Sequence, residues 1–463
     1  MRTLSLGLAA FLGGCAAFSP DGGFGTVESI ARERLDKDLI WARSDADADD
    51  IRARVGELLA SPLSVDDAVQ VALLNNRGLQ AGYAELGIAE ADLVQAGRLP
   101  NPRLSYLRLG RGDELKTETV IGFNILSLLT LPLAAKVEAR RFEQTRYEVA
   151  GEVLRVASET RRTYFQALAA EESVRYLDQV KVAAGAGADL ARRMAQAGNW
   201  SKLTQMREQV FYADATAQLA RATQARATER ERLTRLMGLW GSGIQFKLPE
   251  RLPDLPAAPR ELANIESLAL EQRVDIQAER RRTEAVARSL GLTRATRFIN
   301  ALELAWVLER EGPGRKTGYE VSLELPIFDW GGARVAKAEA IYMRAVNRVA
   351  ETAINARSEV RDAYSAYRTA FDLARHYRDE IVPLRKRISE ENVLRYNGML
   401  IGVFELLADA REQVASVNAY IEALRGFWAA DVELQAALTG KSTGMSSAAT
   451  SAPAPAAKAA GGH

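Results

Sequence analysis

The strongest constraint on this fold is a very long helical pattern in the second half of the chain. Apolar residues recur three or four positions apart from Val335 to Ile381, as they do in coiled coils. At about 1.5 Å per residue, a helix from Gly332 to Asn397 would be roughly 100 Å long. A compact globular domain does not need such a helix, so the sequence predicts an elongated molecule.

An alternating pattern stands directly before this helix and predicts a strand with one apolar face, from Tyr319 to Leu325. Pro326 suits the end of a strand, and Asp329 suits the N-cap of the helix that follows. An ordinary strand-to-helix turn is the alternative reading of this segment. The residues expected to form the strand-to-helix junction are Pro326, Phe328, Asp329, Gly331 and Gly332.

The N-terminus has the features of a secretory signal. An apolar run from Leu4 to Leu12 precedes Gly13, Gly14 and Cys15, the one cysteine of the chain. This ending resembles the lipobox of bacterial lipoproteins, which implies a signal peptide over residues 1–14 and lipidation at Cys15. A plain cleaved signal and an unpaired thiol are the alternatives.

The rest of the chain contains no apolar run of 18 residues, so the sequence predicts no membrane-spanning helix after the signal. Four segments instead have strand character, and the second pair alternates apolar with acidic residues, as membrane barrels require. Four strands cannot close a barrel, so several copies must share one sheet. The four segments are Arg103–Leu109, Thr117–Ile125, Leu302–Leu308 and Tyr319–Leu325.

The chain contains an internal tandem repeat. Glu159, Arg161, Tyr164 and Gly198 recur 200 residues later, and Arg207 to Val210 recur 204 residues later as Arg411 to Val414. Each half is predicted to contain a helix, two strands, a long helix and a final helix. The predicted divisions are an irregular lipidated segment over 15–60, repeats over 61–240 and 261–440, a proline-rich linker over 241–260 and a disordered tail over 441–463. Within the first repeat, one helix is expected from Ser64 to Gly97.

These features together resemble the TolC-like family of outer-membrane efflux factors. The resemblance is carried by Leu99 to Pro102, the junction from Pro326 to Gly332, the repeat and the lipobox. It implies a mixed α and transmembrane β fold, in which long helical hairpins form an α-barrel and four strands per chain join a trimeric 12-stranded β-barrel. The first half departs from the family pattern at Leu129 to Leu133, so its junction is expected to be built differently.

Composition argues against an enzyme and against nucleic-acid binding. The chain has 61 basic and 60 acidic side chains, so it has no excess of positive charge. Its two histidines, His376 and His463, form no motif of a catalytic or metal site. We therefore expect no catalytic residue, no cofactor, no metal site and no nucleic-acid partner.

Two glycine-containing interruptions predict the tips of the long hairpins, and we expect these tips to contact a periplasmic adaptor. By resemblance to the family, Tyr396, Glu405 and Asp409 are candidates for a periplasmic gate. Glu405 and Asp409 share a helix face and could form carboxylate rings in a trimer, or they could be solvated acids on the outer wall. The tip residues are Gly198, Asn199, Trp200, Gly398, Met399, Leu400, Ile401 and Gly402.

The predicted function is that of a passive conduit. The resemblance implies a homotrimer anchored in the lipid of the outer membrane and extending into the periplasm. Its expected partners are a periplasmic adaptor and an inner-membrane pump, which the resemblance suggests is of the resistance-nodulation-division type. A conduit for type I protein secretion and a structural coiled-coil lipoprotein without a pore are the alternatives.

Overall fold

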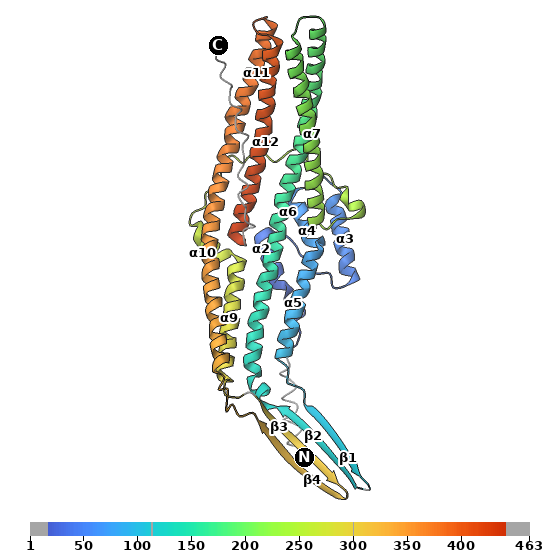
Figure 1. The fold of residues 1–463 in the computed structure, drawn as a ribbon, viewed down its shortest axis with the longest axis vertical. Coiled ribbons are helices and arrows are strands. Elements are labelled where there is room, and N and C mark those ends of the chain that lie inside the picture. Colours follow the sequence, from blue (N-terminus) through green and yellow to red (C-terminus); the bar gives the residue numbers. More distant parts are fainter. Residues whose placement is uncertain (1–16, 113, 300, 441–463) are drawn as a thin grey trace.

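The protein is an elongated bundle of helices with a β-sheet at one end and two helical hairpin tips at the other (Figure 1). The computed structural model describes residues 17–112, 114–299 and 301–440. The predicted signal peptide, Cys15 and the predicted tail over 441–463 lie outside the described residues. No helix in the described part of the chain is both long enough and apolar enough to cross a membrane.

Two long helical columns run the length of the bundle. The first is α6 (Ile125–Gln196). The second is α10 (Gly332–His376), which continues through a π-helical turn, η3 (Tyr377–Ile381), into α11 (Val382–Asn397). The π-helical turn ends two residues before Pro383, a residue that interrupts regular helical hydrogen bonding. The long helix therefore continues to Asn397, as expected.

Shorter helices stacked end to end form two further columns. Helix α5 (Arg77–Ala96) continues the line of α7 (Lys202–Leu236), because Asn76 Nδ2 donates a hydrogen bond of 2.8 Å to the Leu236 carbonyl. Helix α9 (Val274–Ala295) continues the line of α12 (Val403–Thr439), because Arg273 Nη1 donates to the Ala437 carbonyl over 3.4 Å. Asn76 and Arg273 are 197 residues apart, which is the spacing of the predicted repeat in this region.

The main hydrophobic core lies where these columns meet at mid-length. Small residues on α6 and α10, such as Ala157 and Ala363, allow the helices to approach closely. Large rings fill the remaining space: Phe165 stacks on Trp428 with ring centroids 5.0 Å apart, and Phe427 packs on Tyr367.

The N-terminal segment is not irregular, so that expectation was wrong. It forms α2 (Phe24–Leu35) and α3 (Asp45–Leu59), and α3 begins with a capping box between Ser44 and Asp47. The acidic run from Asp45 to Asp50 therefore includes the first turn of a helix. A run such as Asp45, Asp47, Asp49 and Asp50 is also typical of a solvated loop, so the sequence pattern did not indicate a helix here.

The predicted helix from Ser64 to Gly97 is two helices, which corrects a second expectation. Helix α4 (Val65–Asn75) ends at Asn76, whose backbone is extended, and α5 follows at once. The Asn76 side chain accepts a hydrogen bond from the Leu79 amide and also caps α7, so a long-range contact supports the break.

The proline-rich linker between the halves is bonded to three helices. It begins with the short 3-10 helix η2 (Gly241–Ile244) and precedes α8 (Ile265–Gln272). The Leu252 amide donates to Glu172 on α6, and Trp428 Nε1 on α12 donates to the Pro253 carbonyl. Arg378 in the π-helical turn donates to the Leu255 carbonyl. The linker thereby joins α6, α12 and the α10–α11 column at mid-length.

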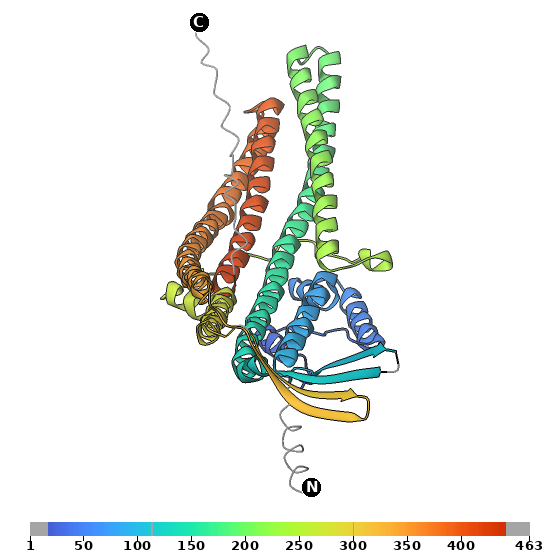
Figure 2. The same cartoon turned by 60° about the horizontal axis from the view of Figure 1, so that its bottom comes forward.

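Four strands form one antiparallel sheet in the order β1-β2-β3-β4. They are β1 (Arg103–Arg111), β2 (Glu114–Asn124), β3 (Leu302–Glu311) and β4 (Gly314–Leu323). The sheet projects from the helical bundle, as the view in Figure 2 shows. The prediction of four strands combined with long helices is confirmed.

Candidate conduit surfaces

The sheet has one apolar face. The register places Leu104, Ile121, Trp306 and Tyr319 in one row across the four strands. Neighbouring rows on the same face add further large apolar residues, several of them about half exposed. An exposed apolar band of this width marks a surface that is covered in the working protein. The added residues are Tyr106, Phe123, Leu302, Leu304, Leu308, Val321 and Leu323.

The opposite face of the sheet carries most of the charged side chains of the strands, although Leu107, Leu109, Val120 and Val307 also lie on it. Lys116 Nζ lies 2.9 Å from Glu309 Oε1, and Lys316 Nζ lies 3.5 Å from Glu311 Oε2. Glu303 and Glu320 lie on the same face. The sheet therefore separates an apolar surface from a polar one, as a barrel wall between lipid and water does.

Strands β1 and β4 are the edges of this sheet, and within the described part of the chain neither has a second partner strand. Unpaired edges expose a row of backbone donors and acceptors that favours pairing with another strand. The sheet is consequently an open segment suited to pairing with further copies of itself.

The second strand-to-helix junction differs from expectation at its helix cap. Gly331, with φ of 73°, is the N-cap residue of α10, and Gly332 is the first residue of the helix. Asp329 does not cap the helix but accepts a hydrogen bond of 2.8 Å from the Gly331 amide. A Cβ on residue 331 would lie 2.5 Å from the Arg297 carbonyl oxygen, so only glycine allows the Arg297 backbone to lie this close. The left-handed backbone conformation of residue 331 favours glycine as well. Pro326 and Phe328 lie in the connecting loop, and the Phe328 side chain is 99% exposed.

The first strand-to-helix junction is shorter. Strand β2 ends at Asn124, whose side chain accepts a hydrogen bond of 2.8 Å from the Ser127 amide and so caps α6 directly. Helix α6 then includes Pro132, so the segment from Leu129 to Leu133 is helical. The two junctions differ because one has a connecting loop of eight residues, 324–331, and the other has none.

The predicted tip residues lie at the ends of the two hairpins (Figure 1). Gly198 and Asn199 are exposed between α6 and α7, and Trp200 is half-buried beside them. Met399 and Leu400 are 93% and 77% exposed between α11 and α12, flanked by Gly398, Ile401 and Gly402. Met399 has a φ of 56°, a left-handed conformation that a non-glycine residue rarely adopts.

The three candidate gate residues differ in their surroundings. Tyr396 is 38% exposed near the end of α11, and Glu405 is exposed in the first turn of α12. Asp409 is only 8% exposed, and its Oδ2 atom has no hydrogen-bond partner among the described residues. The alternative that both residues are solvated acids on the outer wall therefore fits Glu405 but does not fit Asp409.

Near this gate region, an ion pair joins the two hairpins. Arg411 Nη2 on α12 lies 2.6 Å from Oε1 of Glu208 on α7, and the Glu208 side chain is 2% exposed. The Arg411 guanidinium also lies 4.6 Å from the ring centroid of Phe211. Sequence reasoning used Glu208 and Arg411 as repeat markers but did not predict that they pair. The one sequence signal for this pairing was that both residues belong to the repeated motif, Glu208 to its first copy and Arg411 to its second.

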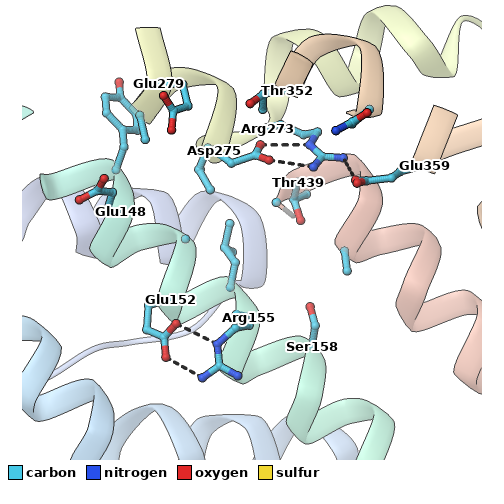
Figure 3. Close-up of a pocket in the computed structure, with 18 of the residues that line it drawn as sticks. Glu148, Glu152, Arg155, Ser158, Arg273, Asp275, Glu279, Thr352, Glu359 and Thr439 are labelled. Carbon is cyan, nitrogen blue, oxygen red and sulfur yellow. Dashed lines mark hydrogen bonds and ion pairs between the residues drawn. The ribbon is translucent and has the colours of Figure 1, made fainter. Parts of the chain in front are cut away.

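A cavity of about 820 Å³ lies where α9 meets the end of α12 (Figure 3). The buried Arg273 side chain there lies 2.8 Å from Asp275 and 2.7 Å from Glu359. On the α6 side, Arg155 pairs with Glu152 and Glu159, and these carboxylates raise its pKa. Glu148 and Glu279 add two more carboxylates to the lining. Six acidic and three basic side chains line the cavity, so its charge is negative: Glu148, Glu152, Asp275, Glu279, Glu351 and Glu359 against Arg155, Arg273 and Arg348.

Comparison with known proteins identifies channel proteins. No family model matches the chain. The chain is 28% identical over 276 residues to the cobalt-zinc-cadmium resistance protein CzcC of Cupriavidus metallidurans. That similarity covers 58% of this chain and 64% of CzcC, so the chain spans less than two thirds of the length of this curated relative.

Solved structures match more of the chain. A membrane protein from Pseudomonas aeruginosa matches with a TM-score of 0.70 and 20% identity, over 81% of this chain and 92% of that one. The outer-membrane channel CmeC of Campylobacter jejuni matches with a TM-score of 0.69 and 18% identity, over 81% and 85% of the two chains. The outer-membrane channel OprN matches with a TM-score of 0.69 and 18% identity, over 92% and 97%.

The fold is therefore the one found in these outer-membrane channel proteins. The resemblance to the TolC-like efflux factors, predicted from the sequence, is confirmed.

Proposed function

We propose that this protein is the outer-membrane conduit of a tripartite efflux system and is not an enzyme. One observation carries the proposal: the four-stranded sheet has one apolar face and two open edges, and its strands lead into long helical hairpins. Such a sheet suits a membrane wall, and hairpins of this length suit a tunnel across the periplasm. The chain supplies passage and no energy.

A homotrimer completes the proposed channel. Pairing β1 of one copy with β4 of the next would give twelve strands from three four-stranded sheets and would remove every open edge. The helical hairpins would close into an α-barrel around the same axis. Asn76 and Arg273, which both cap a stacked helix, support the proposed tandem repeat over 61–240 and 261–440.

Attachment to the outer membrane is proposed to include lipid on Cys15. Near the start of the described residues, the Ser19 amide donates a hydrogen bond of 2.6 Å to Oε1 of the buried Glu90 on α5. The remaining proposed partners are a periplasmic adaptor at the exposed tips and an inner-membrane pump of the resistance-nodulation-division type.

The cavity at the α9–α12 stack supports an acidic bore. Val153 on α6 is buried in the main core, and Arg155 follows it by two residues, about 200° around the helix. The Arg155 side chain therefore points away from that core, and Glu152 pairs with it in the cavity lining (Figure 3). We place this face toward the channel axis, where its net negative charge would favour cations.

Divalent metal cations are the favoured cargo. The name of the Cupriavidus relative refers to resistance to cobalt, zinc and cadmium, and an acidic bore suits such cations. Type I protein secretion remains the second candidate, since the same architecture could pass an unfolded polypeptide. Deleting the gene should raise sensitivity to these metals. Unchanged metal sensitivity together with loss of a secreted protein would favour the second candidate.

The pore itself is tested by conductance of the purified protein in planar bilayers. We expect discrete conductance steps and heat-modifiable migration of an oligomer. A folded protein that shows neither would instead be a structural lipoprotein.

The periplasmic gate is proposed at Tyr396, Glu405 and Asp409. Replacing Glu405 by glutamine should lower cation selectivity if its carboxylate borders the opening. Asp409→Asn changes a carboxylate that is buried within the protomer, so its effect on selectivity should be smaller. Equal selectivity in both variants and the parent protein would remove the carboxylate rings from the proposal.

A further inference from the structure

The apolar face of the sheet ends in a row of arginines. Arg310 on β3 is paired in register with Arg315 on β4 and with Thr117 on β2, and Thr117 is paired with Arg108 on β1. The row thus crosses all four strands and contains three arginines. It lies toward the β-hairpin ends of the sheet, far from the helices (Figure 1).

These arginines are free to bind a partner. All three are exposed, and no described residue forms an ion pair with any of them. The described acidic side chains of the strands lie on the other face, where Lys116 pairs with Glu309 and Lys316 pairs with Glu311. Along the apolar face itself, the described side chains include no carboxylate. The positive charge of the row is therefore not neutralised by the described side chains.

The position of the row matches the edge of a lipid layer. Arg310 follows Leu302 by eight residues, about 26 Å along the strand before tilting shortens it. The apolar band of membrane barrels is about 25 Å tall, and arginine on its lipid face is tolerated near the interface but costly at the centre. Leu302, Leu304, Trp306 and Leu308 fill the interval between the helices and the row.

We propose that Arg108, Arg310 and Arg315 form a binding surface for the phosphate groups of anionic lipid in the leaflet farthest from the helices. This inference rests on the proposed membrane function of the sheet. Guanidinium groups bind phosphate in a bidentate manner, and they do so more strongly where water is scarce. A second copy of the chain would pair at the strand edges and leave this face open, so lipid is the occupant that the geometry favours.

The test compares lipid A carrying two phosphates with the same lipid A lacking them, titrated onto the full-length protein in detergent. The parent protein should prefer the phosphorylated lipid. The triple variant R108Q/R310Q/R315Q should lose that preference, with affinity falling about fivefold per arginine. A matched variant, R221Q/R280Q/R387Q, removes three exposed arginines from the helices and should bind like the parent.

The inference would be overturned if the parent protein bound both lipids equally. It would also be overturned if the helix variant lost as much affinity for the phosphorylated lipid as the triple variant does. A third contrary result would be complete displacement of the phosphorylated lipid by inorganic phosphate at the same concentration. Conductance in planar bilayers of neutral lipid separates this inference from the proposed function. A parent protein that forms pores there but ignores lipid phosphate would contradict the arginine surface alone. Absence of pores would contradict the channel itself.

Discussion

Arg411 on α12 forms an ion pair of 2.6 Å with Glu208 on α7 and so connects the two hairpins near their tips. Removing the cation would leave a buried carboxylate without its partner, at a cost of about 3–5 kcal/mol. We therefore expect Arg411→Met to separate the hairpins and to raise single-channel conductance.

A nearby ion pair provides the control for this prediction. Arg385 and Glu412 pair at 2.9 Å within the α11–α12 hairpin, and Glu412 is 62% exposed. Arg385→Met should leave conductance unchanged, because an exposed pair within one hairpin contributes at most about 1 kcal/mol. Equal conductance in both variants and the parent would show that the Arg411 pair does not hold the tips.

Gly331 should be intolerant of alanine. Its φ of 73° disfavours any side chain, and an added Cβ would lie 2.5 Å from the Arg297 carbonyl. We expect Gly331→Ala to destabilise the protein by about 2 kcal/mol or more, measured as a lower thermal unfolding midpoint in detergent. Gly332→Ala is the matched control, because no atom lies within 4 Å of its Cβ position and helix residues favour alanine. Equal midpoints for the two variants would contradict this account of the junction.

Arg273 should contribute strongly to stability. Its side chain is 1% exposed and pairs with both Asp275 and Glu359. Arg273→Met leaves two carboxylates and a helix carbonyl without their donor, which should cost about 3–5 kcal/mol in chemical unfolding. Arg348, 62% exposed and 3.6 Å from Glu351, lines the same cavity, and Arg348→Met should cost less than about 1 kcal/mol. Adding Asp275→Asn and Glu359→Gln to the Arg273 variant should recover part of the loss.

Tyr164 should make the protein sensitive to alkali. Burial, and secondarily the charge of Asp67, raises its pKa from 10.0 to about 12. A pKa that is higher in the folded state gives stability that is fully present below pH 10 and is lost as the pH rises through about 12. Tyr164→Phe should flatten this alkaline loss in unfolding curves.

At neutral pH two of the buried tyrosines, Tyr164 and Tyr83, should behave in opposite ways. The Tyr164 hydroxyl donates to the Leu63 carbonyl over 2.9 Å, so Tyr164→Phe should cost about 1 kcal/mol. The Tyr83 hydroxyl is buried without a partner among the described residues, and burial raises its pKa. Tyr83→Phe should therefore be neutral or stabilising. Two variants with equal losses would contradict the hydrogen-bond assignment.

Local periodicity explains what could be predicted from the sequence. The strand pattern that begins at Tyr319 in β4 and the helical pattern that begins at Gly332 in α10 each repeat over several residues. Such a pattern can be recognised without knowing which residues pack against it. The same reasoning predicted both hairpin tips, because glycine interrupts a helical pattern in a recognisable way.

The missed features depend on contacts between distant residues. Helix α4 ends at Asn76 because that side chain also caps α7, 160 positions away. The N-cap of α10 is Gly331 and not Asp329, because the Arg297 carbonyl approaches that point of the backbone. The pairing of Glu208 with Arg411 spans 203 positions. No local pattern encodes which residues meet across such separations.

Two of the four helical columns consist of separate helices stacked end to end, α5 on α7 and α9 on α12. In these two columns the chain is not covalently continuous across the stack. Only α6 and the α10–α11 column carry the chain without interruption from the sheet to the tips. The sheet end and the tip end are thus semi-independent modules joined through two continuous helices per chain. In the proposed channel, recombination within those two helices would give the protein new tips, and so a new docking partner, while its sheet stays intact.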